Sequence, residues 1–363
     1  MRSLLSIILV FCLPLILLAG DDCSSTCMPK GLQGISIGGL YYLKYQAGQS
    51  DNGNVNYNKF TVSRGYLTVK KVINEYITSR ITLDTHQDDT GDMKVRVKYV
   101  YADVRFPGFL FITKPHVEFG IVHRPWLDFE EHIDYYRMLD KMFMERIGIF
   151  NSADFGFTFA GYLGGEMCDD YRKTVNNKYP GRYGSFAFGI YNGGGYHAEE
   201  ENQNKTIEAR ITVRPVPDII PGLQISELIM TGKGNGSGVL EDIEDWQTLA
   251  TMLSYEHRYA VLTGTFVSGY GNKSGGWLDD ADYIGYSLFA EGKLGKNWRI
   301  IGRYDIFDPN DDVDDDDYTR IIAGAGYDFG HHNILIADYE IQSYAASGID
   351  DDSRFQLTMQ IHY

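Results

Sequence analysis

The chain has 363 residues and a formal net charge of −16, and Gly (40), Tyr (27) and Phe (19) are frequent whereas Pro (10) is not. An aromatic and glycine-rich composition is typical of β-proteins and disfavours a helix bundle. The length suits two ordinary domains or one closed barrel equally well.

The first twenty residues have the pattern of a secretory signal peptide. Arg2 precedes an apolar run that ends at the small residues Ala19 and Gly20. The alternative, an uncleaved membrane anchor, is disfavoured because the run is short and no basic cluster follows it. We expect residues 1–20 to be removed after Sec-dependent export and residues 21–34 to form a short periplasmic segment.

Three cysteines remain after the signal peptide, in a compartment that permits disulfides. Cys23 could pair with Cys27, or either could pair with Cys168, and one thiol is left over in each case. A zinc site is disfavoured because the Cys23/Cys27 pair has no His or second Cys pair nearby. We expect no metal and no cofactor.

From Ile35 to the end, the chain breaks into segments of about ten residues in which apolar and polar side chains alternate. This period of two is that of a strand with one apolar face. No stretch after the signal approaches the roughly 18 apolar residues of a membrane helix, so a membrane protein of this sequence must be a barrel. About sixteen segments begin near Ile35, Lys59, Tyr76, Met93, His116, Ala153, Tyr183, Lys205, Leu223, Trp246, Tyr259, Tyr283, Trp298, Tyr318, Asn333 and Arg354. In the fourth, the apolar positions are Met93, Val95, Val97, Tyr99 and Tyr101, interleaved with Lys94, Arg96 and Lys98.

The connections between segments alternate in length. Those after odd segments are long, polar and acidic, whereas those after even segments are mostly brief, as in a bacterial outer-membrane barrel with its amino terminus in the periplasm. Two inner connections, 106–115 and 168–182, are longer than this rule predicts. We therefore predict an all-β fold over residues 35–363, a transmembrane antiparallel barrel of about 16 strands.

The connection after the fifth segment is unlike the others, because residues 125–150 are rich in apolar and aromatic side chains. Ile133, Arg137, Met138, Lys141 and Met142 lie three or four apart, which indicates helical structure in part. Such a loop is too apolar for solvent, and the lumen of a wide barrel is the natural place to bury it. Its charges of both signs would then line the constriction: Arg124, Asp128, Glu130, Glu131, Asp134, Arg137 and Lys141. The alternative is that these charges pair with one another and pin the loop to the wall.

At this loop the sequence resembles a known family. The runs FGIVHRPWLDFEEHIDYYR (119–137) and FNSADFG (150–156) resemble the phosphate-selective porin O and P family and its broad porin relatives. The resemblance covers about a tenth of the chain. It implies sixteen strands, passive diffusion and a homotrimer, but the phosphate specificity does not transfer.

Strand parity also predicts a basic face inside the barrel. With acidic outer loops, this face would favour small anions, although acids of the same parity could offset it. The predicted basic stripe is Arg80, Lys94, Arg96, Lys98, Arg210, Arg214, Arg299 and Arg303, and the acids are Asp84, Glu118, Glu208, Glu291, Asp305, Asp338 and Glu340.

Two features near the carboxyl end complete the pattern. The acidic run 308–317 lacks the spaced glycine and terminal Glu of a calcium loop, so we expect a solvated tip, with divalent-ion binding left open. The last segment runs from Phe355 to Tyr363 and ends on the aromatic residue, which resembles the signature recognised by the barrel assembly machinery.

We therefore expect a bacterial outer-membrane porin for small hydrophilic solutes or ions. Its partners would be membrane lipid, lipopolysaccharide and further copies of itself, without nucleic acid. The main alternative is a non-conducting barrel that acts as an adhesin or surface-binding protein. An enzyme is disfavoured because the nine His residues include no hydrolytic motif.

Overall fold

The computed structural model describes residues 31–88, 90–237, 243–274 and 281–363. The predicted signal peptide, most of the predicted periplasmic segment, Cys23 and Cys27 lie outside these residues. The chain divides into two units, 1–35 and 36–363. In the first unit, residues 31–34 form a turn, and the second unit holds the sheet described below.

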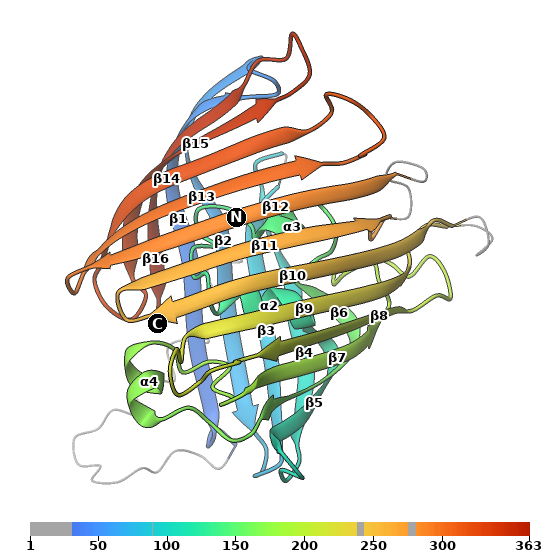
Figure 1. The fold of residues 1–363 in the computed structure, drawn as a ribbon, viewed down its shortest axis with the longest axis vertical. Coiled ribbons are helices and arrows are strands. Elements are labelled where there is room, and N and C mark those ends of the chain that lie inside the picture. Colours follow the sequence, from blue (N-terminus) through green and yellow to red (C-terminus); the bar gives the residue numbers. More distant parts are fainter. Residues whose placement is uncertain (1–30, 89, 238–242, 275–280) are drawn as a thin grey trace, which may run out of the picture. The chain divides into compact units, whose positions relative to one another are not determined.

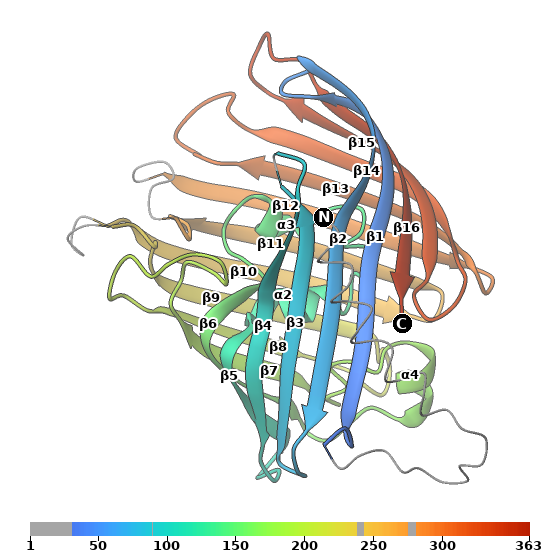
Figure 2. The same ribbon diagram turned by 180° about the vertical axis from the view of Figure 1, so that it is seen from behind.

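Sixteen strands form one closed sheet, which confirms the predicted fold. Every strand runs antiparallel to its neighbours in the sequence, and β1 pairs with β16 from Leu40↔His362 to Gln49↔Ser353. Figures 1 and 2 show the barrel from opposite sides. The strands are β1 Ile35–Ser50, β2 Val55–Val72, β3 Ile77–Gln87, β4 Met93–Arg105, β5 Ile112–His123, β6 Ala153–Leu163, β7 Gly184–Tyr191, β8 Thr206–Val213, β9 Leu223–Lys233, β10 Asp245–His257, β11 Ala260–Tyr270, β12 Asp282–Leu294, β13 Trp298–Asp308, β14 Tyr318–Asp328, β15 Ile334–Tyr344 and β16 Asp352–His362.

The two faces of the sheet differ as the alternating pattern predicts. In β8, Glu208 and Arg210 are buried inside the barrel, whereas Ile207 and Ile211 are 40% and 49% exposed on the outside. An apolar outer face and a polar lumen are the arrangement of a barrel that crosses a lipid bilayer. No helix among the described residues is long and apolar enough to cross a membrane.

The fourth strand departs from the predicted pattern. The β3–β4 register shifts between Thr82 and Leu83, where the partner changes from Tyr99 to Val97. A bulge of this kind places two residues opposite one, so the side chains beyond it change face. Tyr99 is therefore buried in the lumen together with Lys98, and the expected single apolar face of this segment is wrong beyond Lys98.

The connection between β5 and β6, residues 124–152, is called the third loop here. Its helices are α2 (Pro125–Glu131) and α3 (Phe143–Arg146). Pro125 occupies the first turn of α2 and Asp128 adds an acid there, both of which favour a helix start. Residues 133–142, whose spacing suggested a helix, instead form turns and irregular structure. The helix α2 begins earlier, at Pro125.

The third loop forms the core of the barrel. Trp126, Phe129, Phe143 and Phe150 have no exposed surface. They pack in one cluster with inward-facing residues of distant strands, among them Trp246 of β10. Insertion into the lumen, as predicted, buries the apolar side chains that would otherwise face water.

The two long inner connections have separate explanations. Residues 106–115 extend the β4–β5 hairpin, because the Phe106 N–H donates to the Pro115 carbonyl at 2.9 Å and Phe109 bridges Ile112. Residues 168–182 contain a third helix, α4 (Asp169–Thr174), and the segment after it contacts the third loop.

Candidate functional site: the barrel lumen

Arg124 anchors the start of the third loop. Its guanidinium is fully buried and bonds to Glu208 of β8 at 2.7 Å (Nε to Oε2) and to Asp154 of β6 at 3.1 Å (Nη1 to Oδ2). The Glu208 carboxylate also accepts the Trp126 N–H at 3.1 Å. The sequence predicted Arg124 at the constriction, but the structure places it where the third loop contacts the barrel wall.

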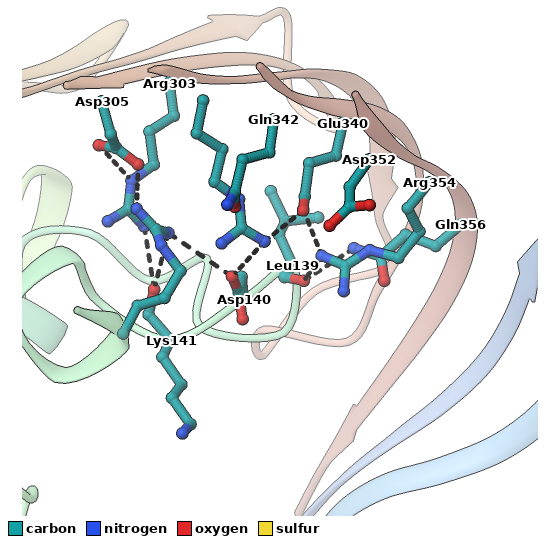
Figure 3. Close-up of polar contacts among 12 residues, drawn as sticks. Leu139, Asp140, Lys141, Arg303, Asp305, Glu340, Gln342, Asp352, Arg354 and Gln356 are labelled. Atoms are coloured by element: carbon teal, nitrogen blue, oxygen red, sulfur yellow. Dashed lines mark hydrogen bonds and ion pairs between the residues drawn. The ribbon is translucent and has the colours of Figure 1, made fainter. Parts of the chain in front are cut away.

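The tip of the loop is held by the opposite wall, as Figure 3 shows. The carbonyl oxygen of Leu139 accepts from Gln356 Nε2 at 2.8 Å and from Arg354 Nη2 at 3.2 Å, both on β16. The carbonyl oxygen of Lys141 accepts from Arg303 Nη1 of β13 at 3.1 Å. Backbone carbonyls of the loop therefore serve as acceptors for wall cations.

Asp140, between these two carbonyls, supplies the only carboxylate of the tip. It bonds to Arg320 of β14 at 2.7 Å and lies 3.5 Å from Arg146 of α3. These guanidinium groups hold the pKa of Asp140 well below its usual range against the effect of burial. Asp140 therefore stays ionised and keeps the tip against β14.

Replacing Asp140 by Ala is expected to loosen this tip. Arg320 would keep its bond to Glu340 but lose its partner on the third loop, so the tip would lose its ion pair with β14. We expect a larger and noisier single-channel conductance in planar bilayers. Asp311→Ala, in the exposed 308–317 loop, is the control, and equal conductance of both variants would contradict the assigned role of Asp140.

The inner connection 168–182 also contacts and supports the third loop. Tyr179 packs edge-on against Phe129, with ring centroids 5.0 Å apart, and its hydroxyl donates to Asp128. Asn176 Nδ2 donates to the His132 carbonyl at 2.8 Å and to Glu256 of β10 at 2.6 Å. The unexpected length of this connection thus allows it to reach the third loop.

The anchors of the third loop described above lie on β6, β8, β13, β14 and β16, and a cavity remains on the side of β1–β4. This cavity has a volume of about 520 Å³, and we call it the passage. Its wall includes Tyr66, Arg80 and Lys98, the third loop adds Asp128, Glu131 and Arg137, and the inner connection adds Lys178.

Cations dominate the strand side of the passage. Lys70, Arg80 and Lys98 line it from β2, β3 and β4, and Lys70 is the direct cross-strand partner of Arg80. Aromatic rings hold two of these cations in place: Arg80 lies 4.7 Å from the Tyr99 ring centre and Lys98 lies 4.7 Å from that of Tyr66.

Arg64 and Arg96 share one carboxylate beside the passage. They bond to the same oxygen of Asp84, at 2.9 Å and 3.0 Å, and the Tyr196 hydroxyl donates to it at 3.1 Å. Two guanidinium groups around one carboxylate leave this part of the wall with a net positive charge.

The loop side of the passage carries both acids and cations. Glu131 bonds to Arg137 at 2.6 Å, and Arg137 also bonds to Glu145. Asp128 lies 3.6 Å from His123 and 3.8 Å from His132. Basic neighbours thus keep the pKa of Asp128 below its ordinary range despite burial.

Two predicted constriction acids lie deeper, where burial favours their protonated forms. Burial raises the pKa of Glu130 to about 8, although Arg303 acts in the opposite direction. Burial likewise raises the pKa of Asp134 to about 6. Glu130 is therefore protonated at neutral pH and adds no charge to the loop.

The raised pKa of Glu130 predicts a pH-dependent stability. Between the unfolded value of 4.5 and the folded value of about 8, the folded chain binds the extra proton, so its stability falls as pH rises through this window. Glu130→Gln should remove this loss, and the midpoint of urea unfolding at pH 5 and pH 9 measures it. Glu131→Gln is the control, and an unchanged pH profile in the Glu130 variant would refute the interpretation.

The structure divides the predicted basic stripe into groups with different surroundings. Arg80 and Lys98 line the passage, and Arg96 lies beside it. Three further members bond to fixed groups elsewhere: Arg210 donates to the Pro125 carbonyl at 3.0 Å, Arg214 to the Tyr171 hydroxyl at 3.0 Å, and Arg299 to Asp328 at 2.9 Å. Arg303 holds the loop tip. The Lys94 side chain is 61% exposed and bonds to Asp88, which lies just before β4 in the chain.

Sequence reasoning missed Arg64, Lys70 and Lys178. Arg64 and Lys70 share the inward parity of Tyr66 on β2. The alternation within the predicted segment beginning near Lys59 could therefore have identified both as inward-facing. Lys178 and Tyr196 belong to connections that enter the lumen. Connections lack the alternating pattern of strands, so the sequence does not indicate which of their residues face the lumen.

The remaining predicted features lie outside the passage. Tyr363 is 62% exposed and stacks edge-on with Tyr41, and Phe355 lies beside Tyr45 on the same outer face. Cys168 is exposed, while its predicted partners Cys23 and Cys27 are not among the described residues. Within the described ranges, no three His, Cys, Asp or Glu are grouped as a metal site requires, the 308–317 loop included.

Neither protein-family models nor curated proteins match this sequence. Solved structures do match its fold. An anion-selective porin from Comamonas acidovorans is 13% identical, with 91% of this chain and 99% of that one covered and a TM-score of 0.60. The outer membrane channel DcaP of Acinetobacter baumannii is 11% identical over 91% and 97% of the two chains, with a TM-score of 0.60. A trimer form of OmpT, an outer membrane protein of Vibrio cholerae, is 13% identical over 91% and 99%, with a TM-score of 0.58.

At this level of identity, the likeness shows the fold. The chain has the sixteen-stranded barrel of porin structures along nearly its whole length.

Proposed function

We propose that this chain is an outer-membrane porin that lets small hydrophilic solutes or ions diffuse passively, with a preference for small anions. The observation that carries the proposal is the charge of the passage. Its lining contains two carboxylates, Asp128 and Glu131, against five cations, Lys70, Arg80, Lys98, Arg137 and Lys178. An excess of fixed cations raises the local anion concentration.

The barrel architecture supports the diffusion role. A barrel of sixteen strands is wide enough for an aqueous channel, and a cavity of about 520 Å³ lies between the third loop and β1–β4. No feature of the passage selects phosphate over other small anions, so the proposed preference is general.

We further propose that the chain acts in the bacterial outer membrane as a homotrimer in contact with lipopolysaccharide, without catalytic activity. The apolar outer face of the strands supports the location. The predicted carboxyl-terminal signature at Phe355 and Tyr363 supports delivery by the barrel assembly machinery after Sec-dependent export.

Conductance in planar bilayers tests the channel. The refolded protein should give stable single-channel steps, and its reversal potential in a potassium chloride gradient should have the sign of an anion-preferring pore. A folded barrel that remains electrically silent would refute the channel and favour the adhesin alternative. Steps with a cation-type reversal potential would refute only the anion preference.

A further inference from the structure

The connection between β7 and β8 turns into the barrel at its start. We call its residues 193–196 the entrance strap, and three of these four residues are glycines. The Gly193 N–H donates to Asp154 Oδ2 of β6 at 3.0 Å, and Asn151 Nδ2 of the third loop donates to the Gly194 carbonyl at 3.3 Å. The base of the entrance strap is thus fixed where β6 meets the third loop.

Tyr196, the last residue of the entrance strap, reaches the part of the wall that β3 and β4 form. Its hydroxyl donates to Asp84 Oδ2 of β3 at 3.1 Å, and the Arg96 guanidinium of β4 lies 4.9 Å from its ring centre. The ring also packs in one buried cluster with Tyr99 and Tyr191. Because β4, β5 and β6 separate β3 from β7 along the wall, the strap crosses the lumen side of these strands.

The contact of Tyr196 lies next to the passage, on the side of the outer connections. Asp84, which accepts from Tyr196, is also bonded to Arg64 and Arg96. Each of these three wall residues stands two positions nearer the outer connections than a residue that lines the passage. In the order Arg64, Asp84 and Arg96, those lining residues are Tyr66, Thr82 and Lys98. A solute that enters from the outer side along β2–β4 therefore meets Tyr196 before it reaches the passage.

The backbone of the entrance strap requires glycine at two positions. Gly193 and Gly195 have φ angles of 109° and 92°, which residues with a side chain rarely adopt. A Cβ on Gly195 would also collide with Nδ2 of Asn151. Glycine restricts the backbone less than any other residue, so the strap has little stiffness of its own. The contacts of Tyr196 therefore hold its far end in place.

We propose that the entrance strap narrows the outer end of the passage and that Tyr196 determines the largest solute admitted there. This inference rests on the proposed channel function. Without the Tyr196 side chain, the glycines would let the strap leave the wall, and the space beside β3 and β4 would widen. Arg64 and Arg96 would still bind Asp84, so the charge of the wall would stay the same. Tyr196 therefore controls solute size and leaves the ion preference unchanged.

The exclusion of polyethylene glycols from the conducting pore in planar bilayers measures this size limit. Tyr196→Ala should admit larger polymers than the wild type, whereas its reversal potential in a potassium chloride gradient should not change. Gln203→Ala, at an exposed residue of the same connection, is the control and should keep the wild-type limit. An unchanged size limit in Tyr196→Ala, or a size limit that changes together with the reversal potential, would overturn the proposal.

A second measurement does not require conduction. Lys98→Cys places a thiol in the passage, and mass spectrometry of its peptide follows the reaction with a bulky, membrane-impermeant maleimide added to intact cells. In this background, Tyr196→Phe keeps the ring but loses the hydroxyl, and the loss of one hydrogen bond should speed the reaction by roughly two- to tenfold. Equal rates with and without the hydroxyl would refute the role of Tyr196. An electrically silent wild type whose labelling still depends on Tyr196 would refute the channel function and support the strap as the outer closure of the lumen.

Discussion

Arg124→Gln is expected to lower the free energy of unfolding by about 3–5 kcal/mol, the usual effect of removing one partner from a buried ion pair. Arg124 has no exposed surface and is the shared cationic partner of Glu208 and Asp154. Without it, two carboxylates would remain buried beside Trp126 with no cation between them. The loop would detach at its first residue, and the lumen would lose its core.

Urea unfolding of the refolded barrel, followed by tryptophan fluorescence, measures this loss. Lys141→Gln is the matched control, because Lys141 is exposed on the same loop and its change removes one charge in the same way. If both variants unfold at the same urea concentration as the wild type, Arg124 is not the anchor that the structure indicates.

The second large effect is expected in ion selectivity. Changing Arg80 and Lys98 together to Gln removes two of the cations that line the passage. A unit charge at about 4 Å in water contributes about 1 kcal/mol, so each change should lower the local anion enrichment by roughly two- to fivefold at low salt. We expect the anion preference to be lost.

The reversal potential in a salt gradient checks this prediction, and it should approach zero in the double variant. The change should shrink as ionic strength rises, because salt screens the wall charges. Lys94→Gln is the control: it belongs to the same predicted stripe, but its side chain bonds to Asp88 at the outer end of β4. Equal shifts in the two proteins would show that the passage does not control selectivity.

The strands could be predicted from the sequence because their signal is local. A strand between lipid and water must alternate apolar and polar side chains. The sequence of each segment therefore indicates which of its residues face the lipid. The predicted starts at Ile35, Met93, Ala153 and Leu223 coincide with those of β1, β4, β6 and β9. The pattern failed at Tyr99, where a bulge changes the face without changing the composition.

The candidate site could be predicted only in part. Parity predicted Arg80, Arg96, Lys98, Arg210 and Arg303 as inward-facing. In the structure, Arg80 and Lys98 line the passage, and Arg210 and Arg303 donate to carbonyl oxygens of the third loop. Whether an inward cation borders open space or meets a loop carbonyl depends on where the third loop lies. That position depends on contacts such as Arg303 with Lys141, which are 162 residues apart in the chain.

The barrel, the inserted loop and the faces of most strands could be predicted from the sequence, because they follow from the energy of placing each side chain in lipid or in water. The side of the barrel on which the cavity lies depends instead on contacts between distant segments. Buried ion pairs such as that of Arg124 with Glu208 join segments far apart in the sequence, and the alternation of side chains within each segment does not predict which segments meet. The passage beside β1–β4, and the entry of residues 168–182 into the lumen, therefore became visible only in three dimensions.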